Sequence, residues 1–534
     1  MKTAIWVLAC VPALCAQSPY AGSEACAVCH PEHYRGFRRT AMARSLAPIS
    51  LRAAPEFQTP VQFSHPRTGS HFRVFHKGPD FVIEEFLPPS AGDLSYSDLR
   101  KVSFTIGSGN HARSYLVERA GRLYEAPVSY YTQIGSWDMS PGYDTEARTG
   151  FTRKITVDCL FCHAGRVKPG GRTNPFLEVS IGCERCHGPG RQHLSGAGGG
   201  IINPAKLSPR LRDEVCDQCH LFGAARVTKL NRRLGDFRGG EPLENYLAIF
   251  TYENAGSGTL SVTGHSEQMK RSGCWQAAGD RLWCGSCHDA HRQPAPAERI
   301  GWYRVRCMNC HQKGGCARKP DRTAPDRDDN CIACHMPKRP VVESAHVIFT
   351  DHRIPRRPVP PTASAGARLK PILRAANDPP HAAARDLGFA YLQAAGSGGH
   401  PEFLELGIRE LEPLAETEAA DAEVWEKLGE AYLSTRQFAK AERAFRRAAG
   451  LNPKSAAAQY GLGFLSQARG ALPDAIEAYR KAIALDPEMA EAYGNVAAAY
   501  ASAGRNDDAA DALRKALQLD PGNLRWRQAL RTLR

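Results

Sequence analysis

Seven copies of one short pattern contain most of the reactive side chains in this 534-residue sequence. In each copy two residues separate a pair of cysteines, and a histidine follows the second cysteine directly. Thiols and imidazoles at this spacing can hold zinc, form a disulfide, act as a redox thiol pair or anchor a c-type haem. The copies are Cys26-Cys29-His30, Cys159-Cys162-His163, Cys183-Cys186-His187, Cys216-Cys219-His220, Cys284-Cys287-His288, Cys307-Cys310-His311 and Cys331-Cys334-His335.

The repetition and the constant histidine separate these alternatives. Cys183, Cys186, His187 and His193 would by themselves make a plausible tetrahedral zinc set. A zinc ribbon needs no histidine after each cysteine pair, however, and a thioredoxin-like site needs a single pair. In c-type attachment two thiols bond to the vinyl groups of one porphyrin, and the adjacent imidazole becomes the proximal iron ligand. The sequence therefore predicts seven covalently bound c-type haems, attached by the 14 motif cysteines, with the seven motif histidines on the irons.

A second histidine on each iron would give a low-potential, six-coordinate centre suited to electron transfer. Ten further histidines lie in the same part of the chain, which is more than the seven that such centres need. Three of them, His33, His71 and His76, are predicted to be surface residues, and Met42 is predicted to be a core residue. The seven predicted distal ligands are His65, His111, His193, His265, His291, His346 and His352.

The first residues read as a secretory signal that occupies positions 1–16. Lys2 supplies the charge, a short apolar run follows, and Ala13 to Ala16 offer small residues for cleavage. Acylation of Cys10 or Cys15 is a weaker alternative. No later stretch resembles a transmembrane helix. We expect a periplasmic or extracellular protein, in which the two spare cysteines, Cys274 and Cys316, form a disulfide.

The formal net charge is +14, a balance that often indicates nucleic-acid binding. Seven haems would bring 14 propionate charges, which would cancel this excess. Arginine and lysine side chains are suitable propionate partners, since a guanidinium matches a carboxylate fork. No nucleic-acid motif supports the other explanation, so no nucleic-acid partner is expected.

Three parts follow one another along the chain. Residues 17–355 contain every motif and form the predicted heptahaem domain, and residues 356–376 are a Pro- and Ala-rich linker. Residues 377–534 repeat every 34 residues, with small residues, a bulky residue and a proline recurring. This pattern resembles tetratricopeptide helix hairpins that end in a capping helix. The recurring sets are Gly429, Gly463 and Ala497; Ala441, Ala475 and Ala509; Phe445, Tyr479 and Leu513; and Pro453, Pro487 and Pro521.

The heptahaem domain has little helical periodicity. "HFRVFHKGPDFVIEEF" predicts a hairpin that turns at Gly78-Pro79, and "SYLVERAGRLYEAPVSYY" predicts another that turns at Ala120-Gly121. We expect an α+β, loop-rich domain with a small antiparallel sheet and short helices around the haems, followed by an all-α tetratricopeptide solenoid.

Several longer segments resemble the cytochrome c554-like multihaem family, in particular its bacterial branch with a C-terminal tetratricopeptide array. They are "IGSGNHARSYL", "WDMSPGY", "IGCERCHGPGRQH", "CWQAAGDRLWCGSCHDAH", "CIACHMPK" and "FTDHRI". The resemblance implies closely packed bis-histidine haems that carry electrons, and it supports His111, His193, His265 and His291 as ligands. The family archetype has four haems and no helical repeats, so ligand pairing and redox partners do not transfer.

The function favoured by these observations is electron transfer through seven haems, with the repeats serving as the surface where redox partner proteins dock. No catalytic residue is assigned, and an electron carrier is favoured over a catalyst. The alternative is a multihaem reductase of a small nitrogen or sulfur compound, which would use one haem with an open site. Peripheral association with a membrane is left open.

Overall fold

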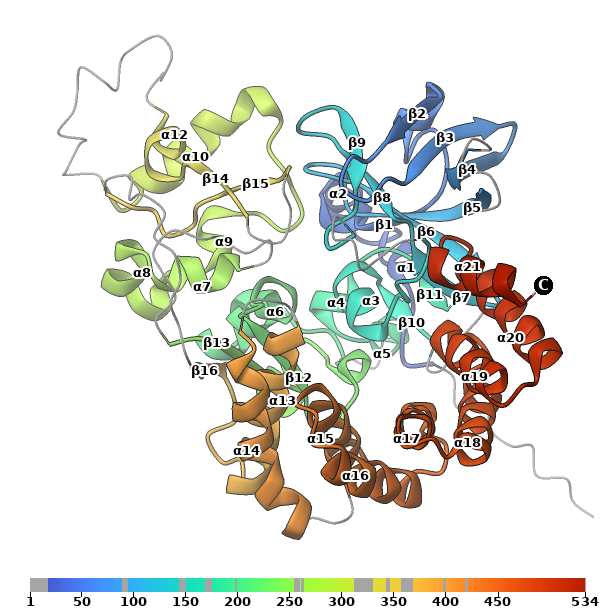
Figure 1. Cartoon of the computed structure of the whole chain (residues 1–534). Helices are drawn as coiled ribbons and strands as arrows, with labels where there is room; N and C mark the ends of the chain where they lie inside the picture. The colour runs from blue at the N-terminus through green and yellow to red at the C-terminus, as the bar shows by residue number, and fades with distance from the viewer. Residues whose placement is uncertain are drawn as a thin grey trace, which may run out of the picture.

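The computed structural model describes residues 18–88, 95–143, 150–168, 175–196, 199–253, 260, 264–311, 330–341, 346–356, 368–396, 400–417 and 421–533. The predicted signal segment, and Cys316 of the predicted disulfide, lie outside these residues; Cys274 is described and its thiol is free. A sheet-rich region with short helices is followed by an arc of long helices (Figure 1). The predicted α+β class with a helical solenoid is therefore confirmed.

The largest sheet has seven antiparallel strands in the order β2-β3-β4-β5-β6-β7, with β1 also paired to β5. Both predicted hairpins are present, with closing pairs Lys77–Asp80 and Arg119–Arg122. Ala120 and Gly121 have φ of 47° and 77°, the positive values that a tight hairpin turn of this twist requires. The strands are β1 (Leu46–Pro48), β2 (Val61–Ser64), β3 (His71–Lys77), β4 (Asp80–Leu87), β5 (Tyr96–Ile106), β6 (Ser114–Arg119) and β7 (Arg122–Glu125).

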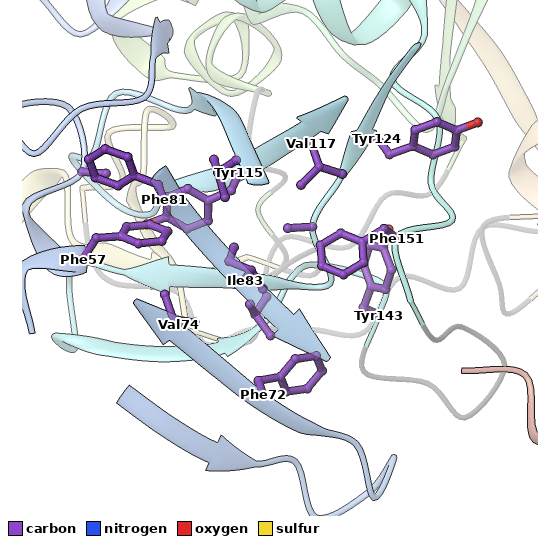
Figure 2. Packing of buried hydrophobic residues seen from close by; sticks show 14 of the residues in the cluster. Phe57, Phe72, Val74, Phe81, Ile83, Tyr115, Val117, Tyr124, Tyr143 and Phe151 are labelled. Carbon is purple, nitrogen blue, oxygen red and sulfur yellow. The ribbon is translucent and has the colours of Figure 1, made fainter. Parts of the chain in front are cut away.

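Aromatic and aliphatic side chains of this sheet form its core, which includes Phe57, Phe72, Ile83, Tyr115 and Tyr143 (Figure 2). The hairpin of β8 (Val128–Tyr131) and β9 (Ser136–Met139) packs on it. Three further small sheets lie among the short helices. They consist of β10 (Arg166–Val167) with β11 (Phe176–Glu178); β12 (Ala225–Thr228), β13 (Leu247–Tyr252) and β16 (Leu369–Leu373); and β14 (Lys338–Pro340) with β15 (Ile348–Thr350).

Most short helices of the first region contain or adjoin a cysteine–histidine motif, whereas α5, α7 and α8 lie between motifs. Between them the chain runs in turns and in the small sheets. They are α1 (Ser23–Cys26), α2 (Pro31–Phe37), α3 (Val157–His163), α4 (Glu184–His187), α5 (Arg191–Leu194), α6 (Pro209–His220), α7 (His265–Lys270), α8 (Gly273–Ala278), α9 (Cys284–Cys287), α10 (Arg299–Met308) and α12 (Cys331–His335).

The C-terminal region is an array of helix hairpins, as the 34-residue period predicts. Glycines allow the helices to approach closely, since a Cβ at Gly429 or Gly463 would lie 2.7 Å from the ring of Phe445 or Tyr479. The hairpins pair α13 (Pro380–Gly396) with α14 (Glu402–Thr417), α15 (Ala422–Ser434) with α16 (Phe438–Leu451), α17 (Ala456–Ala468) with α18 (Leu472–Leu485), and α19 (Ala490–Ser502) with α20 (Asn506–Leu519), followed by α21 (Leu524–Thr532).

The first hairpin of the array shares a core with the region before it. Residues 369–373, inside the predicted linker, form strand β16 and pair with β13. Tyr391 and Phe403 of the hairpin pack in one apolar cluster with Phe250. The buried Lys229 reaches Asp386 at 2.6 Å and also contacts Asp378. The interval predicted as a linker is therefore partly ordered as a strand that joins the two regions.

The last repeats are attached to the large sheet by polar contacts. Arg122 lies 3.3 Å from Asp486 and 3.0 Å from Glu488, and Lys154 lies 2.7 Å from Asp486. Arg119 donates to the carbonyl oxygen of Leu519. The array thus bridges two separate sheets of the first region, from α13 beside β12–β13–β16 to α19–α21 beside β7 (Figure 1). Among the described residues, no helix has the length and apolar character needed to cross a membrane.

Asp486→Asn should loosen the last repeats, because it removes a carboxylate that pairs with both Arg122 and Lys154. Burial by itself would raise the pKa of Asp486, but Lys154 and Arg122 lower it, so the ion pairs stabilise the folded state at neutral pH. We expect the free energy of local unfolding of the last repeats to fall by about 1–2 kcal/mol, because the two ion pairs are partly buried. Hydrogen exchange of α19–α21 measures it, with the exposed Asp474→Asn as a matched control; equal protection in both variants would contradict the attachment.

Glu85 of the large sheet and Asp520 of the last repeats are buried carboxyl groups at the contact between these two regions. Burial raises the pKa of Glu85 to about 7 and that of Asp520 to about 6, and the two carboxyls lie near each other beside Asp98. A raised pKa in the folded state means stability that is present at low pH and is lost as pH rises through these values. Unfolding by urea should show stability falling between about pH 5 and pH 8 in the parent and changing less in Glu85→Gln. An unchanged slope in the variant would exclude Glu85 as the titrating group.

Candidate metal centres

One turn of helix positions the three side chains of a motif. The backbone N–H of the motif histidine donates to the carbonyl of the first cysteine, at 2.9 Å for His30 and His288 and 3.0 Å for His187 and His311. Residues three and four apart lie on the same face of a helix. Each motif, numbered 1 to 7 in chain order, therefore presents both thiols and the imidazole on one side.

Thiols of different motifs contact each other, although they are far apart in the sequence. Hydrogen bonds join Cys26 to Cys183 and Cys162 to Cys219, which brings motif 1 beside motif 3 and motif 2 beside motif 4. Further hydrogen bonds join Cys216 to Cys284 and Cys307 to Cys331. These contacts bring the motifs together in three groups: 1 with 3; 2 with 4 and 5; and 6 with 7.

The orientation of the motif imidazoles suits ligation through Nε2. The Nδ1 of His187 lies 2.8 Å from the carbonyl oxygen of Ile202, and the Nδ1 of His335 lies 3.2 Å from that of Pro355. The Nδ1 of His288 lies 3.3 Å from the hydroxyl of Tyr303. A carbonyl oxygen that accepts from Nδ1, as at His187 and His335, favours the tautomer that leaves the Nε2 lone pair for a metal.

Three of the predicted distal ligands lie beside motif histidines. The ring centroids are 5.8 Å apart for His187 and His291, 5.3 Å for His220 and His265, and 6.2 Å for His288 and His352. An iron about 2 Å from each ligating nitrogen would separate two imidazole centroids by about 6 Å. These distances fit a metal held between two rings.

Burial keeps several of these imidazoles neutral, as ligation requires. Burial, together with His352 and His220, lowers the pKa of His288 to about 4. Burial also lowers the pKa of His220 and, more strongly, that of His265. The Nδ1 atoms of His163, His220 and His265 are buried without a hydrogen-bond partner.

The other predicted distal ligands have different surroundings. His111 stacks on Phe349 at 4.1 Å, with its Nδ1 2.7 Å from Gln133. His65 and His346 both face Asp138, at 3.9 Å and 2.5 Å. His193 is exposed on α5, and within the described ranges no ring contact joins it to a motif histidine.

Two contacts of this region were not expected from the sequence. His33 is exposed, as predicted, yet its ring lies 4.9 Å from that of His291. Its position on α2, three residues after His30, could have indicated that it lies near the motif histidines. Asp138, which joins His65 and His346, has no such signal, because the three residues are distant in the chain.

The packing around the motifs fits a large apolar group. Helices α8, α9, α10 and α12 have no buried residues of their own. Val28, Val157 and Val305, next to or within motifs, are 83%, 68% and 59% exposed. Nor do any three His, Cys, Asp or Glu side chains among the described residues form a cluster that could hold a bare metal ion. The zinc set considered from the sequence is therefore not assembled, whereas a porphyrin would cover the open apolar surface.

Comparisons with known proteins match both regions of the chain. Residues 133–188 match the family "Cytochrome c554 and c-prime". Residues 426–487 and 465–523 match the tetratricopeptide repeat. The multiheme cytochrome MtrA of Shewanella baltica is 24% identical over 208 residues, which cover 36% of this chain. The match spans 56% of the length of that relative.

Solved structures resemble part of the chain. A crystal structure of MamA protein is 28% identical with a TM-score of 0.24, covering 27% of this chain and 75% of its own. MamA from Desulfovibrio magneticus RS-1 is 23% identical with a TM-score of 0.26, covering 28% and 83%. The resemblance drawn from the motifs is confirmed by the two family matches. The chain is thus similar to the cytochrome c554 family within its motif-bearing region and to tetratricopeptide repeats in its C-terminal region.

Proposed function

We propose that this protein transfers electrons through seven covalently bound haems. The observation that supports this most directly is the contact between thiols of different motifs, such as Cys162 with Cys219 and Cys216 with Cys284. Groups attached at such thiols are neighbours, and electron transfer requires redox centres that lie close together. A bound haem supplies an iron that accepts and releases one electron.

The chain's own residues attach and orient these groups. In each motif the two cysteines form thioether bonds, and the histidine serves as the proximal ligand. His291, His265 and His352 are the distal ligands proposed for motifs 3, 4 and 5, opposite His187, His220 and His288. His65, His111, His193 and His346 are kept as distal ligands for the remaining motifs, without assigned pairing. Two histidines on an iron favour a low potential.

The location and partners are proposed on the same basis. Covalent haem attachment and the signal-like residues 1–16 support a periplasmic or extracellular protein. Tetratricopeptide repeats support binding of a redox partner protein on the array. Both ends of the array pack against the motif-bearing region of the same chain. A redox partner would therefore bind to the central helices α15 to α18.

Mass spectrometry of the secreted, denatured protein should show seven covalent haem additions on one chain, because denaturation removes only noncovalent groups. Tandem fragments should place them on the seven cysteine pairs. Disulfides between motif thiols, such as Cys162 with Cys219, in place of thioethers in a fully matured sample would overturn the proposal.

His291→Ala should convert one haem from low spin to high spin, because the imidazole opposite His187 is removed. Low-temperature EPR of the oxidised protein measures this as the appearance of a high-spin ferric signal from one haem. His381→Ala is the matched comparison and should leave the spectrum unchanged, since His381 is exposed near the start of α13, outside the motif-bearing region. A spectrum of His291→Ala identical to that of the parent would contradict the assignment of His291.

A further inference from the structure

Two arginine side chains lie between motif 2, which is on α3, and motif 4, which is on α6. The guanidinium of Arg185 donates to the carbonyl oxygen of Phe161 and lies 4.0 Å from the centre of the Phe161 ring. The guanidinium of Arg226 donates to the carbonyl oxygen of Gln218 at 2.9 Å. Phe161 and Gln218 are buried, and each stands directly before the second cysteine of its motif. The backbone of each motif therefore fixes one of the two arginines.

These positions bring both positive charges close to the thiols that join the two motifs. The Nη1 atom of Arg226 lies 4.0 Å from the Sγ atom of Cys162. Both guanidiniums are within electrostatic range of Cys162 and of Cys219. Arg226 is part of strand β12, and its backbone N–H donates to the side-chain oxygen of Gln393 on α13 at 3.0 Å. A group attached at either thiol would lie beside two cations.

Little negative charge offsets these two arginines. No carboxylate among the described residues forms an ion pair with either of them. Asp158 is within electrostatic range of Arg226 without pairing with it. The Nε atom of Arg185 is buried and, within the described ranges, has no hydrogen-bond partner. In contrast, Arg353 pairs with Asp351 at 2.6 Å. The positive charge of both arginines therefore acts on the thiols of motifs 2 and 4 with little compensation.

Motif 1 has surroundings of the opposite charge. Glu178 and Glu184 are within electrostatic range of the Cys26 thiol. The buried Glu184 accepts a hydrogen bond from the backbone N–H of Gly22 at 2.8 Å. Glu178 accepts one from the hydroxyl of Ser23 at 2.5 Å. These contacts hold two carboxylates beside the first motif.

We propose that these charges set the reduction potentials of three haems: Arg185 and Arg226 raise those on motifs 2 and 4, and the two carboxylates lower that on motif 1. A haem iron carries one more positive charge when oxidised than when reduced. A nearby cation therefore favours the reduced form, and a nearby carboxylate favours the oxidised form.

The proposal rests on the electron-transfer function above and adds a direction to it. Arg185 belongs to motif 3, which adjoins motif 1, so its contact with Phe161 links motif 1 to motif 2 through motif 3. Electrons are driven along this path from motif 1 toward motifs 2 and 4, where the potential is higher.

A redox titration of the mature protein, followed by haem absorption and EPR, tests the effect of the arginines. In Arg226→Gln two midpoint potentials should become more negative by about 59 mV, a tenfold change in a one-electron equilibrium. Arg226→Lys keeps the charge and should shift them less. Arg233→Gln removes the same charge from the exposed loop between β12 and β13 and should leave the potentials in place. Equal shifts in Arg226→Gln and Arg226→Lys, or none beyond the Arg233→Gln control, would overturn the proposal.

Glu178→Gln tests the opposite charge and does not depend on whether the Arg226 variants mature. Loss of this carboxylate should move a midpoint potential to a more positive value, and an absent or negative shift would refute its role. Cys26→Ala with Cys29→Ala removes the motif 1 haem. The midpoint potential that disappears should lie below the middle of the parental values, and one above the middle would refute the direction.

The denatured mass of the parent separates failure of this inference from failure of the proposed function. A parent without covalent haem refutes the function itself. A fully loaded parent whose variants fail the tests above refutes the effect of the charges alone.

Discussion

The structure depends on one local constraint, the single turn of helix that holds two thiols and an imidazole on the same side. The hydrogen bond from the histidine N–H to the first cysteine carbonyl recurs in motifs at opposite ends of the region, at His30 and His311. A turn this short has no stable existence by itself. Its neighbours must therefore stabilise it, and in α9, α10 and α12 the polypeptide supplies little buried surface. In the proposed account, a covalently bound haem would therefore serve both as the cofactor and as part of the core around these helices.

The tetratricopeptide array is fixed to the motif-bearing region at both of its ends, which gives it a structural role. Its first hairpin shares an apolar core with β12, β13 and β16, and its last repeats form ion pairs with residues on and next to β6–β7. These two sheets belong to different parts of the motif-bearing region. Because the array is fixed to both sheets, it restrains the distance between them. Such a restraint is useful where the distances between redox centres matter. Burial raises the pKa of Glu85 and of Asp520 at one of these attachments, so its stability is expected to depend on pH.

Short-range sequence patterns predicted much of this fold, but they could not predict contacts between segments that are distant in the chain. The alternation around Gly78 and Ala120-Gly121 located both hairpins, and the 34-residue period located the helix pairs. Strand β16 was missed because its residues, Leu369–Leu373, are Pro-containing and become a strand only by pairing with β13. His291 and His265 were predicted as ligands and lie beside motif histidines. Asp138, which joins His65 and His346, depends on contacts between distant segments that no spacing rule encodes.

Coulometric titration of the mature protein tests the central claim most directly, because it counts the electrons that one chain accepts. Seven covalent haems connected by close contacts predict reversible uptake of seven electrons per chain, with the haem absorption bands following the charge throughout. Uptake of clearly fewer electrons, or charge that passes without a change in the haem bands, would contradict the account.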